Sequence, residues 1–197
     1  VPNTINGIPV IGVAEEAFLD AMYSEDIKES GEEELHLRSI TLPETVVEIE
    51  DEAFFNVYSL KFFTAPGLKK VGKFSLEAPI VYLDAPNIEE IGFKGLSTNL
   101  SDLNLPNLTV VNNSAFADSK FLTSVNFSSL ENIPVYCFSK CPRLKYVSLP
   151  SAITIDDAAF MECFLLSELY LPKVEYLIST SGNKHGPYDT LYIQLFG

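Results

Sequence analysis

The chain has 197 residues, 47% of them hydrophobic and 20% charged, and its formal net charge is −14 at pH 7. This composition is too apolar for a disordered protein, and the negative charge argues against nucleic acids and anionic membrane surfaces as partners. The sequence holds no run of the roughly 18–20 apolar residues that a membrane-spanning helix needs, so we expect no membrane insertion.

The N-terminal quarter carries most of the excess negative charge. Residues 1–52 contain 14 of the 27 acidic residues but only two of the 13 basic ones. The sequence starts at Val1 without the basic and apolar segments of a signal peptide, so none is expected within it. Segment 24–34 is predicted to be an acidic insertion, either a solvated loop or a frayed helix. An alternative role for this segment is to bind a basic partner.

A frame of three apolar residues begins at Leu37, continues with Ile40 and Leu42, and is closed by Pro43. The residues that close the later copies stand at positions 66, 86, 106, 128, 150 and 172, at steps of 23, 20, 20, 22, 22 and 22 residues. Regular spacing of this kind is the signature of a solenoid. We therefore predict an α/β solenoid, a right-handed superhelix with one parallel β-strand in each repeat of about 22 residues.

A second column of the repeat holds large apolar residues, each usually preceded by a small one. Its predicted members are Phe18, Phe54, Phe74, Leu96, Phe116, Phe138 and Phe160. Lys73 is the exception among the preceding residues. We expect a short helical turn here, on the side of the solenoid opposite the strands. Acidic residues just before the column would cap the start of that turn.

The pattern breaks near the C-terminus. Segment 179–189 contains two glycines and a proline, and the alternation of segment 191–195 predicts a closing strand. We therefore expect one domain, residues 1–197, with about seven repeats and an irregular end or cap at 173–197.

Two copies of the frame carry a distinctive Cys-x-x-Leu ending, Cys141 to Leu144 and Cys163 to Leu166. Together with the apolar triplet, the proline and the Ala-Phe pair, this frame resembles the BspA-like leucine-rich repeat family. The resemblance implies a leucine-rich repeat solenoid. It also implies a bacterial protein that is secreted or attached to the cell surface and adheres to host or bacterial surface proteins or glycans.

The strand residues between the inward apolar positions are predicted to form an exposed sheet face. One column holds Phe62, Tyr82 and Tyr146, and the neighbouring column holds Tyr170. Exposed aromatic side chains are enriched at protein interfaces. The alternative is that they favour strands and pack on one another across turns. The candidate ligand-binding residues are Phe62, Tyr82, Asp84, Asp102, Asn104, Tyr146 and Tyr170.

The sequence offers no constellation for catalysis. Its two histidines, His36 and His185, lack the companions of a zinc site, and no nucleophile-elbow or phosphate-loop motif is present. Cys141 and Cys163 lie in adjacent repeats, where they form either a disulfide or a buried column of thiols. We therefore expect no enzyme, metal or cofactor. The function predicted is an extracellular binding or adhesion module, and the alternative is a spacer within a larger surface protein.

Overall fold

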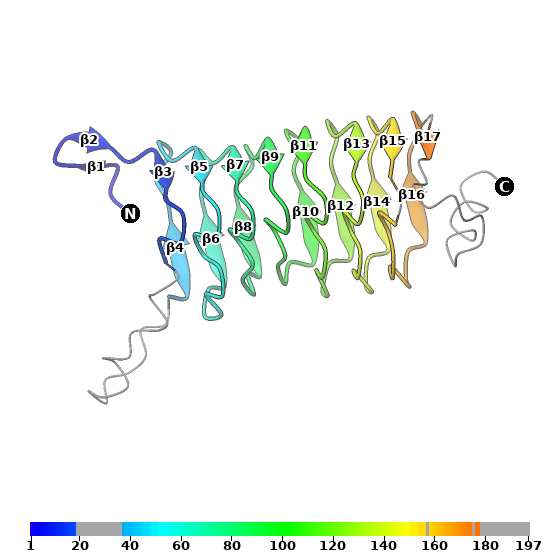
Figure 1. Ribbon diagram of the computed structural model, residues 1–197, viewed down its shortest axis with the longest axis horizontal. Coiled ribbons are helices and arrows are strands. Elements are labelled where there is room, and N and C mark those ends of the chain that lie inside the picture. The colour runs from blue at the N-terminus through cyan, green and yellow to red at the C-terminus, as the bar shows by residue number, and fades with distance from the viewer. Residues whose placement is uncertain (19–36, 157, 175, 178–197) are drawn as a thin grey trace.

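The computed structural model describes residues 1–18, 37–156, 158–174 and 176–177. It confirms a parallel-strand solenoid whose coils stand in an elongated row (Figure 1). One strand of three residues per coil forms the broad side, which we call the front face. The front strands are β4 (Ser39–Thr41), β6 (Phe62–Thr64), β8 (Tyr82–Asp84), β10 (Asp102–Asn104), β12 (Ser124–Asn126), β14 (Tyr146–Ser148) and β16 (Glu168–Tyr170).

A second set of two-residue strands, which we call the back ladder, runs along a second side of the solenoid. It comprises β3 (Gly12–Val13), β5 (Glu48–Ile49), β7 (Lys70–Val71), β9 (Glu90–Ile91), β11 (Val110–Val111), β13 (Asn132–Ile133), β15 (Thr154–Ile155) and β17 (Tyr176–Leu177). Its strands pair in two sheets, which divide between β11 and β13. An antiparallel hairpin of β1 (Thr4–Ile5) and β2 (Ile8–Pro9) projects from the N-terminal end of the row (Figure 1).

The front strands pair in the register that the repeat predicts, but they do not form one continuous sheet. Ser39 lies opposite Phe62, which lies opposite Tyr82, and this register ends at β8. A second sheet of β10, β12, β14 and β16 begins with Asp102 opposite Ser124. The seven front strands therefore divide into one sheet of three strands and one of four.

Inward side chains of all coils form one hydrophobic core. Phenylalanines of the second column stack along it, with ring centroids 5.2 Å apart between Phe116 and Phe138 and 5.3 Å between Phe138 and Phe160. One member of the predicted column is wrong. Leu76, which is fully buried, takes the position assigned to Phe74, and buried Ser75 is the small residue before it.

The predicted helical turns are also wrong, because the described residues contain no helix. In each coil the residue two before the buried large side chain has a left-handed backbone, as in Glu52, Lys94 and Tyr136. A left-handed residue interrupts a right-handed helix. The N–H groups instead donate to the next coil: Phe54 N to Ser75 O at 2.9 Å and Phe116 N to Cys137 O at 3.0 Å. This third side is therefore held by hydrogen bonds between coils.

The acidic residues before this column act across coils as well. The Asp51 carboxylate accepts a hydrogen bond from the backbone N–H of Lys73 at 2.7 Å, and Glu50 accepts one from Glu15 N at 3.0 Å. The acids were expected to cap a helix in their own coil. They cap backbone groups of neighbouring coils instead, because no helix is present for them to cap.

The coils differ in length because residues are inserted or omitted at two places in the repeat. The 23-residue step contains one extra residue in its turn: three residues separate Leu42 from Val46, whereas two separate Ala65 from Leu68 in the next coil. The 20-residue coils omit two residues before the front strand, since only three residues separate Leu76 from Ile80.

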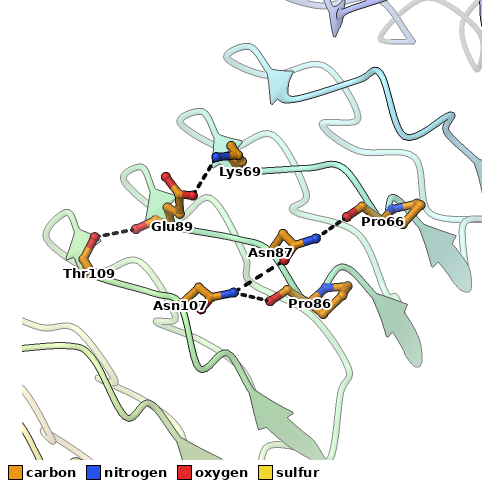
Figure 2. Close-up of polar contacts among 7 residues, drawn as sticks. All are labelled: Pro66, Lys69, Pro86, Asn87, Glu89, Asn107 and Thr109. Carbon is orange, nitrogen blue, oxygen red and sulfur yellow. Dashed lines mark hydrogen bonds and ion pairs between the residues drawn. The ribbon is translucent and has the colours of Figure 1, made fainter.

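The corners that follow β6 and β8 are fixed by polar side chains, as Figure 2 shows. The Asn87 amide donates to the carbonyl oxygen of Pro66 at 2.7 Å, and the Asn107 amide donates to that of Pro86 at 3.3 Å. Each proline ends the strand pairing, and its own carbonyl oxygen accepts a hydrogen bond from the asparagine of the next coil. Lys69 and Glu89 form an ion pair beside this corner, at 2.9 Å.

Four sequence predictions lie outside the described residues. They are the acidic insertion at 24–34, the two histidines His36 and His185, the break at 179–189 and the closing strand at 191–195.

Candidate binding face

The alternation of each three-residue strand determines which side chains reach the front face. In β6 the middle residue, Phe63, points into the core and is fully buried, so Phe62 and Thr64 point outward. The same alternation places all seven predicted ligand-binding residues on outward positions of front strands. The structure separates them into three groups along the face.

The N-terminal group consists of Phe62, Tyr82 and Asp84. The rings of Phe62 and Tyr82 are register partners with centroids 6.5 Å apart and a tilt of 44°. Each side chain nevertheless remains 51% exposed. Contact between the rings therefore covers part of their surface and leaves the rest exposed to solvent as an aromatic patch. Half-buried Asp84 lies next to this patch.

The central group is polar and internally hydrogen-bonded. The Asp102 carboxylate accepts bonds from the hydroxyls of Ser101, at 2.6 Å, and Ser124. These two bonds, the Ser101 bond first, hold the pKa of Asp102 below its ordinary value. Beside them the Asn126 amide donates to the side-chain oxygen of Asn104 at 3.1 Å. Asp102 is therefore anionic at neutral pH and fixed in orientation.

The C-terminal group holds the two remaining tyrosines. Tyr146 is 48% exposed and Tyr170 is 60% exposed. They are not register partners, because Tyr146 lies opposite Glu168 and Tyr170 lies opposite Ser148. Strands β10 and β12 separate this group from Phe62 and Tyr82 (Figure 1). The four aromatic residues thus form two patches with a polar strip between them.

Sequence reasoning missed the residues that border the face. The Arg143 guanidinium stands over the Phe121 ring, 5.1 Å from its centroid, although Phe121 is 43% exposed. Arg38 and Lys61 line a pocket beside Phe62. Arg38 and Lys61 directly precede a front strand, and Phe121 and Arg143 come three residues before one. A search of the columns flanking the strands would have found them.

The cysteines are present as thiols. Cys141 Sγ donates to the carbonyl oxygen of Phe116 at 3.3 Å, and Cys163 Sγ donates to that of Phe138 at 3.1 Å. Burial raises the pKa of Cys137, and the hydrogen bond with Cys163 together with burial raises that of Cys141. The sequence left open whether Cys141 and Cys163 form a disulfide or a column of thiols, and in the structure they are thiols. Thiols held protonated in this way are weak nucleophiles and weak metal ligands.

Among the residues that the structure describes, no three side chains of histidine, cysteine, aspartate or glutamate are grouped so that they could hold a metal ion. The described segments also contain no helix of the length and apolarity required to cross a membrane.

Comparison with known proteins identifies relatives of the repeat and of the fold. A family model described as "BspA type Leucine rich repeat region" matches in six copies over residues 26–78 and 79–182. Comparison with curated proteins gives no match.

Solved structures of two leucine-rich repeat proteins are similar to this chain. A leucine-rich repeat protein from Bacteroides ovatus is 24% identical with a TM-score of 0.72, and the match covers 94% of this chain and 49% of that one. A leucine-rich repeat protein from T. pallidum is 22% identical with a TM-score of 0.66, covering 84% of this chain and 76% of that one. At these identities the two structures support the fold. This chain spans about half the length of the Bacteroides protein.

Proposed function

Because this chain belongs to the family of BspA-type leucine-rich repeat proteins, we propose that it is a non-catalytic module that binds a protein or glycan through its front face. Leucine-rich repeat proteins generally mediate protein binding. The repeat residues themselves build the coil and its core. Recognition therefore depends on the outward residues, which differ from one coil to the next.

The observation that carries this proposal is the exposure of Phe62 and Tyr82. An aromatic side chain on a strand can serve stability by packing on its cross-strand neighbour, and that contact removes part of its surface from solvent. Here both rings keep 51% of their surface accessible although they contact each other. Large, partly exposed aromatic side chains supply much of the binding energy at protein interfaces.

The polar strip between the aromatic patches also supports binding through the front face. Asp102 is held by the hydroxyl of its chain neighbour Ser101 and by that of Ser124 on the adjacent strand, and Asn104 is held by Asn126. Fixed polar groups lose little conformational entropy when a ligand binds, so they favour specific recognition. We include Asp84, Tyr146 and Tyr170 as flanking contacts on the same face.

We place this binding outside the cell. BspA-type leucine-rich repeat proteins are typically bacterial surface proteins. In that setting the partner is a protein or glycan of a host or of another bacterium, and the activity is adhesion.

A spacer is the second candidate. Hydrogen bonds between coils join the row along three sides, which favours a stiff rod (Figure 1). A spacer requires no ligand on the front face, so its solvent-facing aromatic residues would have no role in binding.

A binding screen separates the two functions. The purified full chain is applied in a concentration series to arrays of extracellular matrix proteins and of glycans. The proposed function predicts saturable binding to at least one component, and binding that falls when Tyr82 and Tyr146 are both changed to alanine. A spacer predicts no saturable signal at any concentration.

A further inference from the structure

A pocket lies at the edge of the front face near its N-terminal end. Four residues line it: Arg38, Ser59, Lys61 and Phe62. Its volume is about 360 Å³, which lies at the small end of the range for ligand pockets. The space is large enough for one side chain of a partner and too small for a folded element.

Two of the lining residues, Arg38 and Lys61, carry a positive charge. Arg38 and Lys61 occupy the same repeat position in successive coils, directly before the front strand, and Lys61 N donates to Arg38 O at 2.9 Å. Strands of one sheet lie about 4.8 Å apart, so the two side chains leave the backbone at that spacing. A single carboxylate placed between them can pair with both.

Within the described part of the chain, neither cation has a carboxylate within ion-pair distance. The lysines of the back ladder differ in this respect. Lys69 pairs with Glu89 at 2.9 Å and Lys70 with Glu48 at 2.8 Å. Two cationic residues therefore border a pocket whose own surface is nearly all apolar, in a chain whose net charge is −14, and their charges favour an acidic group.

The remaining walls are apolar or already bonded. Phe62 contributes an exposed ring, and the two cations contribute the hydrocarbon stems of their side chains. The Ser59 hydroxyl is used, because it donates to the carbonyl oxygen of Leu37 at 3.1 Å. A sugar ring would bring several hydroxyl groups that need partners of their own, and leaving them unpaired is unfavourable. An acidic side chain brings one carboxylate and a short apolar stem.

We infer that this pocket binds the carboxylate of an aspartate or glutamate side chain in an acidic segment of a partner protein, which pairs with Arg38 and Lys61 while its stem contacts Phe62. This inference deepens the proposed function and rests on it. It adds that the protein partner presents an acidic residue to the N-terminal end of the front face.

The test uses the full chain and two fluorescein-labelled peptides, one of six glutamates and one of six glutamines. Fluorescence polarisation is measured for the wild type and for an Arg38→Met/Lys61→Met variant, which keeps the apolar stems and removes the charges. A Lys69→Met/Lys70→Met variant on the back ladder is the control, since it changes the net charge by the same amount. Circular dichroism establishes that each variant is folded.

The inference predicts that the glutamate peptide binds the wild type at least fivefold more tightly than the glutamine peptide, and that added salt weakens this binding. The pocket variant loses at least fivefold in affinity, and the control variant stays within twofold. Equal binding of both peptides, equal loss in both variants, or competition by free glucuronate instead of free glutamate would overturn it. Its failure is distinct from that of the proposed function, because the array screen can still show saturable binding that depends on Tyr82 and Tyr146, neither of which lines the pocket.

Discussion

A β-carbon on Gly67 would overlap the backbone carbonyl group of Glu44 in the preceding coil. Glu44 belongs to the turn that contains the extra residue of the 23-residue step. The next coil therefore makes room for the longer turn, because Gly67 has no side chain.

This relationship predicts the effect of Gly67→Ala. The new methyl group meets backbone rather than a movable side chain, so we expect the free energy of unfolding to fall by about 3 kcal/mol. Urea unfolding followed by circular dichroism measures the change. Deleting Glu44 in the same chain gives this turn the length found in the other coils, and should restore much of the lost stability. If the deletion adds its own full cost to that of Gly67→Ala, the proposed relationship between the two coils is wrong.

The left-handed residues of the turns predict a stabilising substitution. Lys140 is exposed, has a φ of 58°, and donates its N–H to Met161 O at 2.7 Å. Glycine adopts this backbone without steric cost, so Lys140→Gly should raise the free energy of unfolding by about 0.5–1 kcal/mol. The matched control is Lys145→Gly, next to front strand β14, where glycine should lower stability by a similar amount. A loss of stability in both variants would contradict the left-handed turn.

The Asp102 cluster predicts a pH dependence. Hydrogen bonds from Ser101 and Ser124 lower the pKa of Asp102 from 3.8 in the folded protein. Asp102 therefore contributes stability above the unfolded pKa, and this contribution is lost as the pH falls through the folded pKa. We expect Asp102→Asn to lower the urea midpoint at neutral pH, and the difference from wild type to shrink as the pH falls below 3.8. A difference that is constant with pH would show that the carboxylate charge has no role.

Ser124→Ala is the companion variant, since it removes one donor to the same carboxylate and should reduce the pH dependence without abolishing it.

The thiol column predicts the redox state of the protein. Unfolding without reductant should expose three thiols to a colorimetric thiol reagent. In the native protein Cys163, which is half-buried, should be alkylated before Cys137 and Cys141, which are fully buried. Mass spectrometry after timed alkylation gives the order. Recovery of a single thiol after unfolding would reveal a disulfide and contradict the column.

The sequence predicts the front strands well, because strand alternation and the closing prolines mark the register of residues such as Phe62 and Tyr82. It fails at the turns. The left-handed positions hold Lys94 and Tyr136 instead of glycine or asparagine, so residue type gives no signal for them. Aromatic type favours Phe74 for the buried column, whereas the distance from the closing proline places Leu76 there, ten residues after Pro66 as Leu96 is after Pro86.

The candidate site follows the same division. Its outward columns are predictable from alternation alone. The break between β8 and β10 depends on how whole coils stack, so no local pattern reveals it. The pocket at Arg38 and Lys61 likewise depends on side chains from two coils meeting at one edge.

The assignment of binding to the front face is tested most directly by two double-alanine variants assayed on a partner found in the array screen. Phe62→Ala/Tyr82→Ala removes the exposed aromatic patch of the front face. Tyr136→Ala/Phe164→Ala removes two exposed rings from the turns, where they are 43% and 76% accessible. Surface plasmon resonance should show at least a tenfold loss of affinity for the front-face variant, since truncation of a central aromatic contact costs about 2 kcal/mol or more. The turn variant should stay within twofold of wild type. Unchanged affinity in the front-face variant, or an equal loss in the turn variant, would contradict the account.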